Sequence, residues 1–153
     1  MKQRVLAAFA IPALAFAGCG SVTSDIDFQP PASGWTASPP ILGRTQIWIK
    51  SGSSNHNSVV VLVRGVNQNK DIFDNPGLSS SNARMNKDEH VTICGNEQAE
   101  HFVGTGKSNG APSVFEAYAA TVHGEKYLAF YVRPEDQPTD LQAESAIKSL
   151  CPK

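Results

Sequence analysis

The sequence predicts an α+β domain in which hairpins form an antiparallel β-sheet and a C-terminal helix packs on one face of it. Runs of β-branched and aromatic residues alternate with short turn sequences from residue 45 to residue 133. The last apolar stretch instead has helical spacing, because Ala143, Ile147 and Leu150 fall at positions i, i+4 and i+7. Strands followed by one packed helix are typical of the α+β class with an antiparallel sheet.

The N-terminus has the order of an export signal, which we expect to span residues 1–18. Lys2 and Arg4 form a positive flank, and residues 5–17 form an apolar stretch without a charge. This stretch is too short to cross a bilayer core, which needs roughly 20 residues in a helix. Pro12 also interrupts it. The sequence therefore predicts a signal peptide rather than a membrane-spanning helix.

The end of this signal, Phe16-Ala17-Gly18-Cys19, resembles the lipobox of bacterial lipoproteins, which usually have leucine in place of Phe16. The resemblance implies cleavage before Cys19, a diacylglycerol thioether on its sulfur, and acylation (palmitate) of the new N-terminus. Two or more acyl chains hold a protein stably on a membrane. Gly20 is not the aspartate of an inner-membrane retention signal, which favours the outer membrane, facing the periplasm. The alternative is plain secretion after a cut behind Ala15-Phe16-Ala17.

The stretch over residues 19–44 is expected to hold the lipidated cysteine and a flexible tether. It contains four prolines among many Ser, Thr and Gly residues and has little periodicity. Within it, Gly34-Trp35 is where we expect the chain first to touch the domain, since a lone tryptophan in a polar stretch usually packs. A single domain is expected over residues 45–153.

Three hairpins are predicted within the domain, each from two strand-like runs on either side of a turn sequence. Residues 67–87 are predicted to be a loop with at most one helical turn, and a helix is predicted over residues 139–150. Thr139 and Gln142 fit a capping box at its start. The strand pairs are residues 45–50 with 58–66, residues 89–94 with 98–105 around Gly95-Asn96, and residues 113–122 with 126–133 around His123-Gly124-Glu125.

Several short motifs resemble those of a group of small bacterial envelope proteins. They are Ile93-Cys94-Gly95-Asn96 with Ala99, residues 127–131 followed by Arg133-Pro134, and Leu150-Cys151-Pro152. The order of hairpins and closing helix is also similar to the PsbP-like fold, which covers photosystem subunits and bacterial lipoproteins. The resemblance implies an accessory or binding module and supplies no catalytic motif.

The three cysteines form an odd set, which would leave one thiol over in an oxidising compartment. If Cys19 carries lipid, Cys94 and Cys151 remain as a pair, and export favours a disulfide between them. Strict alternation, however, places Cys94 on the face of Thr92 rather than on that of Ile93. If the helix covers the Ile93 face, a bulge or twist near the turn must redirect Cys94.

The four histidines do not have the close spacing of zinc ligands, and we expect no metal site. A two-residue turn at Gly95-Asn96 would set His90 opposite His101. Facing imidazoles could share a metal, or repel each other once both are protonated near pH 6. A register slip or bulge would instead separate them.

No motif for catalysis is present, so we expect no enzyme activity and no cofactor. The chain has no Gly-x-Ser-x-Gly sequence, and Gly52-Ser53-Ser54 is more simply a turn. Gly106-Lys107-Ser108 has the end of a P-loop, but His101 stands at the position of its first glycine. Asp71 and Asp74 are expected to be solvated loop charges.

Composition narrows the function further. The chain is 41% hydrophobic and 18% charged, as in an ordinary globular protein. Without Lys2 and Arg4 it has 11 basic and 14 acidic side chains, a net charge of about −3, and no basic cluster for nucleic acid. We therefore expect a lipid-anchored envelope protein that binds a membrane through its lipid, and another envelope protein or a small ligand through its domain. The alternative is an envelope hydrolase with a dispersed active site.

Overall fold

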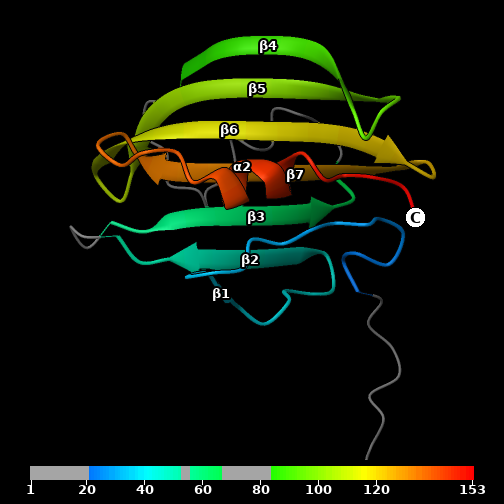
Figure 1. The fold of residues 1–153 in the computed structure, drawn as a ribbon, viewed down its shortest axis with the longest axis horizontal. Coiled ribbons are helices and arrows are strands. Elements are labelled where there is room, and N and C mark those ends of the chain that lie inside the picture. Colours follow the sequence, from blue (N-terminus) through cyan, green and yellow to red (C-terminus); the bar gives the residue numbers. More distant parts are fainter. Residues whose placement is uncertain (1–20, 53–55, 67–83) are drawn as a thin grey trace, which may run out of the picture.

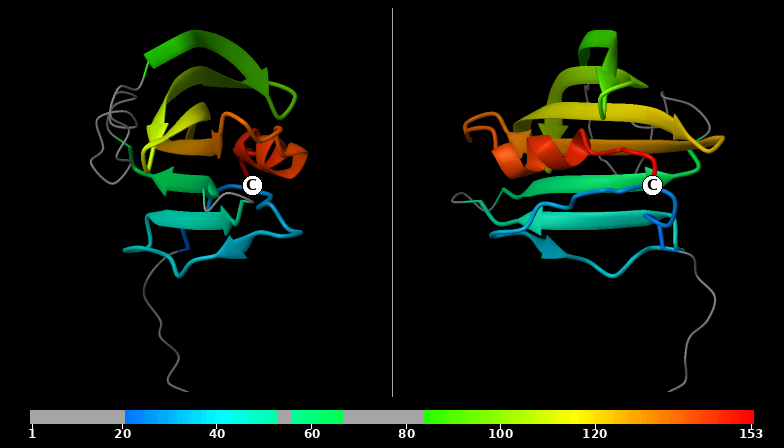
Figure 2. Two further views of the ribbon diagram at one scale, coloured as in Figure 1. Left: turned by 90° about the vertical axis from the view of Figure 1, so that its left-hand side faces the viewer. Right: turned by 45° about the vertical axis from the view of Figure 1, so that its right-hand side comes forward.

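The computed structural model describes residues 21–52, 56–66 and 84–153. In this part of the chain, seven strands form one antiparallel sheet in the order β1-β2-β3-β7-β6-β5-β4 (Figure 1). The helix α2 (Leu141–Ile147) lies across β7 and β3 on one face (Figures 1 and 2). The strands are β1 (Thr36–Ala37), β2 (Thr45–Lys50), β3 (Ser58–Arg64), β4 (Arg84–Ile93), β5 (Glu97–Ser108), β6 (Ala111–Val122) and β7 (Glu125–Pro134).

The fold is mainly β, so the predicted α+β class is wrong. Strands hold 55% of the described residues and the helix holds 6%. The predicted helix over residues 139–150 shrinks to seven residues. It starts late because Asp140, not Thr139, caps it by accepting from the backbone N–H groups of Gln142 and Ala143. The strands are also longer than predicted, because β5 and β6 each run for 12 residues.

Two of the three predicted hairpins form as expected. β2 pairs with β3, whose apolar residues on both faces fit its place between β2 and β7. β6 pairs with β7 through His123-Gly124, where both residues have positive φ (49° and 79°), as a type I′ turn requires. Asn109-Gly110 joins β5 to β6 in the same way, with φ of 50° and 80°.

The β4–β5 hairpin differs from its prediction by one residue in register. Ile93 lies opposite Glu97, so three residues, Cys94-Gly95-Asn96, form the turn instead of two. Cys94 and Gly95 both have positive φ, 52° and 87°. Residues 84–87, predicted as loop, are the start of β4, while residues 67–83 lie outside the described residues. Because strand side chains alternate between faces, this one-residue shift changes which side chains meet across the hairpin.

Both faces of the sheet are apolar. The helix-side face packs under α2 and the N-terminal segment, whereas the other face holds a second cluster with three phenylalanines at its centre. Sheet residues of the helix-side face include Trp48, Val60, Leu62, Tyr118, Tyr127, Ala129 and Tyr131. Residues of the opposite face include Val61, Phe102, Phe115, Leu128, Phe130 and Val132.

The folded part of the chain begins earlier than the predicted boundary at residue 45. Val22, Ile26 and Phe28, which fall in the predicted tether, are buried in the helix-side core, as is Trp35. Phe28 packs on Trp48 with ring centroids 5.3 Å apart. These apolar residues stand alone in a polar sequence, and they become core because a distant part of the chain covers them.

The partner of this N-terminal segment is the C-terminus. Ile26 forms an antiparallel bridge with Pro152, and the backbone N–H of Asp27 donates to the carbonyl of Cys151 at 2.8 Å. The two segments therefore lie side by side at one end of the sheet (Figure 2). We call this the terminal end, and it also holds the turns at residues 42–44, 94–96 and 123–124. The far end holds residues 51–52, 56–57, 109–110 and 135–140.

Candidate functional site

Several predicted site residues lie outside the described residues. These are Cys19 with the signal peptide over residues 1–18, the loop aspartates Asp71 and Asp74, and the serines Ser53 and Ser54. The described part of the chain contains no helix long and apolar enough to span a bilayer. Lipid attachment at Cys19 stays a prediction.

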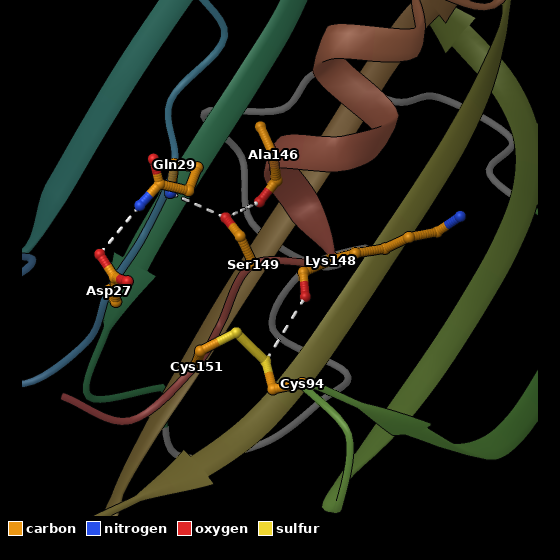
Figure 3. The surroundings of a disulfide bond; sticks show 7 residues. All are labelled: Asp27, Gln29, Cys94, Ala146, Lys148, Ser149 and Cys151. Atoms are coloured by element: carbon orange, nitrogen blue, oxygen red, sulfur yellow. Dashed lines mark hydrogen bonds between the residues drawn. A yellow bond between two sulfur atoms is a disulfide. The ribbon is translucent and has the colours of Figure 1, made fainter.

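The predicted disulfide is confirmed. Cys94 and Cys151 are bonded, with their Cα atoms 5.6 Å apart (Figure 3). The positive φ of Cys94 supplies the redirection that strict alternation required, since Cys94 is the first residue of the turn and not the last of β4. The bond therefore fastens the β4–β5 hairpin to the segment that follows α2.

The C-terminal half of the disulfide is held by further contacts. The Ser149 hydroxyl donates to the carbonyl of Ala146 at 2.7 Å and accepts from the backbone N–H of Gln29 at 2.9 Å (Figure 3). Three segments that are distant in sequence thus meet at the terminal end: the N-terminal segment, the β4–β5 turn and the chain after α2.

A cluster of charged side chains occupies the helix-side face of β4, β5 and β6, and we call it the His101 cluster. Its members are Glu89, His101, Glu116 and Tyr118. His101 Nδ1 lies 3.0 Å from Glu89 Oε1, and its Nε2 lies 2.9 Å from Glu116 Oε1. The imidazole also stacks on Tyr118, with ring centroids 4.4 Å apart. His101 of β5 therefore has one partner on β4, Glu89, and two on β6, Glu116 and Tyr118.

Each ring nitrogen of His101 faces one carboxylate oxygen. A carboxylate only accepts hydrogen bonds, so a ring nitrogen donates to it when that nitrogen carries a proton. Hydrogen bonds from Lys87 and from His101 hold the pKa of Glu89 below its ordinary value. Burial, and then the charge of Glu116, raise the pKa of Tyr118, so its hydroxyl stays protonated at physiological pH.

This arrangement leaves little scope for acid-base catalysis at His101. A general base needs a free ring nitrogen within reach of a substrate proton, and both nitrogens of His101 face carboxylates. The ring is also 9% exposed. The cluster is chemically suited to holding three strands together beside β7 and β3, the strands that α2 covers.

The predicted His90–His101 pair does not form. The observed register sets His101 opposite Glu89 and His90 opposite Glu100, so the two imidazoles lie on opposite faces of the sheet. The described residues contain no group of three or more His, Cys, Asp or Glu side chains that could hold a metal ion.

Sequence reasoning missed the carboxylates around His101, although one signal was available. Glu116 interrupts an otherwise apolar strand, between Phe115 and Ala117. A charge at the centre of a buried strand needs a charged partner on a neighbouring strand. The position of Glu116 therefore indicates that it has a charged partner. Which residue is that partner depends on the registers of the β4–β5 and β5–β6 hairpins.

Two hollows mark the surface of the described residues. The larger of the two, of about 580 Å³, is at the far end, and its lining includes His56, Gly110, Pro112, Glu135 and Asp136. A second hollow, of about 410 Å³, has His90 and Lys126 on its rim and lies on the opposite face of the sheet from α2. The larger one is within the size range of small-molecule sites.

No protein-family model matches the chain, and no curated protein matches its sequence. Solved structures do match. LpqN of Mycobacterium tuberculosis, a protein involved in cell envelope biogenesis, aligns with a TM-score of 0.55 at 16% sequence identity, over 80% of this chain and 79% of LpqN. PA94 of Pseudomonas aeruginosa, a protein of unknown function and candidate regulator, aligns with a TM-score of 0.53 at 12% identity, over 79% of this chain and 99% of PA94. At such identities the likeness shows that the chain shares its fold with these bacterial proteins.

Proposed function

We propose that this chain is a bacterial envelope lipoprotein, anchored through lipid on Cys19, whose β domain is a non-catalytic binding or accessory module. The observation that carries the proposal is the use of its three cysteines. Cys94 and Cys151 form a disulfide, which is typical of an exported protein. The remaining cysteine, Cys19, ends the lipobox-like motif directly before the folded domain.

Two findings support the role of the domain. LpqN, which has the same fold, is involved in cell envelope biogenesis. His101, which is buried, has a carboxylate at each ring nitrogen and is therefore suited to a structural task. The hollow at the far end, with His56 and Asp136 on its rim, is where a small ligand would fit. The PsbP-like resemblance stays a prediction.

Lipid labelling tests the anchor. We expect the wild-type protein, expressed in a bacterium fed labelled palmitate, to take up the label and to partition into detergent, and a Cys19→Ser variant to do neither. The Cys94→Ser, Cys151→Ser double variant is the matched control, because it removes the other two cysteines of the chain and keeps Cys19. Wild-type protein without label, or label that persists in Cys19→Ser, would show that Cys19 is not the anchor.

The membrane of residence is tested in the same cells. We propose the outer membrane, facing the periplasm, because Gly20 follows Cys19. Labelled protein should sediment with the dense outer-membrane fraction. Recovery in the light inner-membrane fraction would contradict this part of the proposal alone.

A further inference from the structure

The spacer between the lipid site and the folded domain is very short, and this limits how the domain can sit on a membrane. Val22 is 3% exposed and belongs to the helix-side core. It follows Cys19 by three positions, and three extended residues span about 10 Å. A lipid on Cys19 therefore holds the terminal end of the sheet within about one helix diameter of the bilayer surface.

That end of the sheet carries the most exposed large hydrophobic side chain in the described residues. Leu42 is 88% exposed and its neighbour Ile41 is 50% exposed. They form the tip of the turn before β2, directly after Pro39-Pro40. Large aliphatic side chains that project from a turn are energetically unfavourable in water, and they are typical of surfaces that meet a partner.

The tip is a defined structure rather than a loose loop. The backbone N–H of Ile41 donates to the carbonyl of Thr45 at 2.8 Å, and the N–H groups of Arg44 and Thr45 donate back to the carbonyl of Ile41. Leu42 has a φ of 51°, a conformation that a bulky residue rarely adopts. An exposed leucine in this backbone conformation adds no stability to the isolated domain.

The tip and the chain entry lie on the same end of the sheet, joined through Arg64. The backbone N–H of Arg64 donates to the carbonyl of Arg44 at 2.8 Å, next to the tip. Its guanidinium donates to the Ser24 hydroxyl at 2.7 Å and pairs with Asp25 at 2.8 Å. These contacts link the start of the described chain to the tip, and both segments lie at the same end of the sheet (Figure 2).

We propose that the terminal end lies flat against the lipid bilayer, with Leu42 and Ile41 inserted among the headgroups and upper acyl chains. The inference rests on the proposed lipid on Cys19, because the spacer length then brings the tip to the bilayer. An inserted side chain at an interface lies about 5–10 Å deep, which a turn tip with two aliphatic residues can reach. The lipid supplies affinity and the tip supplies orientation, so that the hollow at the far end faces away from the membrane.

Fluorescence quenching tests this orientation on the processed, lipidated full-length protein. A Leu42→Trp variant is reconstituted into phosphatidylethanolamine–phosphatidylglycerol vesicles with or without brominated acyl chains. Leu141→Trp is the matched control, because Leu141 is 76% exposed on the first turn of α2, toward the far end. Trp35 and Trp48 are buried, so the wild-type protein gives the background.

We expect bromine to quench the added emission of Leu42→Trp about twofold or more, consistent with a depth of about 5–10 Å, and to leave that of Leu141→Trp unchanged. Equal quenching of the two variants, or none in either, would overturn the orientation. Emission from Leu42→Trp that is blue-shifted but insensitive to bromine would show that a protein surface covers the tip instead. Palmitate uptake by the same sample separates these outcomes from failure of the anchor, since a sample without lipid contradicts the proposed function first.

Discussion

Under α2, the helix-side face of the sheet is made of Leu62, Tyr127 and Ala129, whereas the same face of β4, β5 and β6 carries Glu89, His101 and Glu116. The difference follows from the size of the helix. Seven residues make a helix about 10 Å long, and a helix of about 10 Å diameter covers roughly two strands spaced 4.8 Å apart. Strands beyond its reach need another way to complete their inner face.

The strands under α2, which we call the covered half, complete their inner face with apolar packing. The strands β4, β5 and β6, which we call the uncovered half, do so with the charged and polar side chains of the His101 cluster. Tyr118 lies at the border, since it belongs to the apolar core and also stacks on His101. The comparison shows that a short helix suffices for this seven-stranded sheet when a half-buried cluster of polar side chains links the remaining strands. It also predicts that the two halves respond differently to mutation and pH.

The largest effect is expected from the disulfide, the covalent link between the two halves. Cys94→Ser with Cys151→Ser opens a loop of 57 positions, for which the chain-entropy model gives about 4 kcal/mol of lost stability. Urea unfolding of the exported protein measures the loss. Amide exchange should accelerate more in β4 and β5 than in β7, since β7 keeps its cover by α2. A loss below about 1 kcal/mol, or equal acceleration in all strands, would contradict the link between halves.

A smaller loss is expected at the His101 cluster. His101→Ala removes a buried ring and leaves Glu116 without its hydrogen-bond donor, so we expect the stability at neutral pH to fall by about 2 kcal/mol. His101→Phe keeps a ring on Tyr118 and isolates the effect of the two lost N–H groups.

The loss of stability at the His101 cluster is expected to depend on pH. The pKa of Glu89 is lowered in the folded protein by Lys87 and His101, so its stabilising effect is present above about pH 4.5 and is lost as the pH falls through the lowered pKa. In the variant, Glu89 and Glu116 flank position 101 without the histidine between them, and protonation in acid weakens the repulsion between these carboxylates. The difference between His101→Phe and wild type should therefore be largest at neutral pH and shrink in acid. A difference independent of pH would show that the cluster contributes packing only.

The smallest loss of stability is expected at Asp140, a charged residue of the covered half that caps α2 and pairs with Lys50. Burial pushes the pKa of Asp140 upward, but hydrogen bonds from Lys50 and from the N–H groups of Gln142 and Ala143 outweigh it and hold the pKa below its ordinary value. Asp140→Asn keeps a cap and loses the charge, so we expect a loss of about 0.5 kcal/mol at neutral pH. This contribution is lost as the pH falls below about 3.8, where the wild type and the variant should converge.

Asp140→Ala is the companion variant, because it also removes the cap acceptor and should cost about 1 kcal/mol more. Thermal unfolding between neutral and acidic pH measures both. If Asp140→Asn and Asp140→Ala were equally stable, the cap would contribute nothing to the seven-residue helix.

The sequence patterns predicted the strands best where alternation and turn chemistry agreed. β2, β3, β6 and β7 fall within a few residues of their predicted bounds, and the turn predicted at His123-Gly124-Glu125 forms from its first two residues, because Glu125 already belongs to β7. The helix was correctly placed but overextended, because the capping box at Thr139 competes with a nearby aspartate that also contacts Lys50. That contact links residues 90 positions apart and is invisible to local reasoning.

The candidate site was predicted only in part. The disulfide followed from counting cysteines, but the surroundings of His101 depended on whether two or three residues form the turn at Cys94-Gly95-Asn96. A cysteine with positive φ is not a pattern that turn statistics favour, and one residue of register decides which side chains share a face. The burial of Val22 and Ile26 was missed for a similar reason, since the segment that covers them is the opposite end of the chain.

The pairing of the N-terminal segment with the C-terminus also determines when, during synthesis, the N-terminal segment can be covered. Lys153 donates to the carbonyl of Thr23, a contact across 130 positions. A ribosome adding about 5–20 residues per second needs roughly ten seconds to span that interval. Throughout it, Val22 and Ile26 lack the C-terminal segment that covers them, although Phe28 can already pack on Trp48. The N-terminal segment is therefore fully covered only after the last residues have been made, and a chain that ended a few residues early would lack the bridge between Ile26 and Pro152.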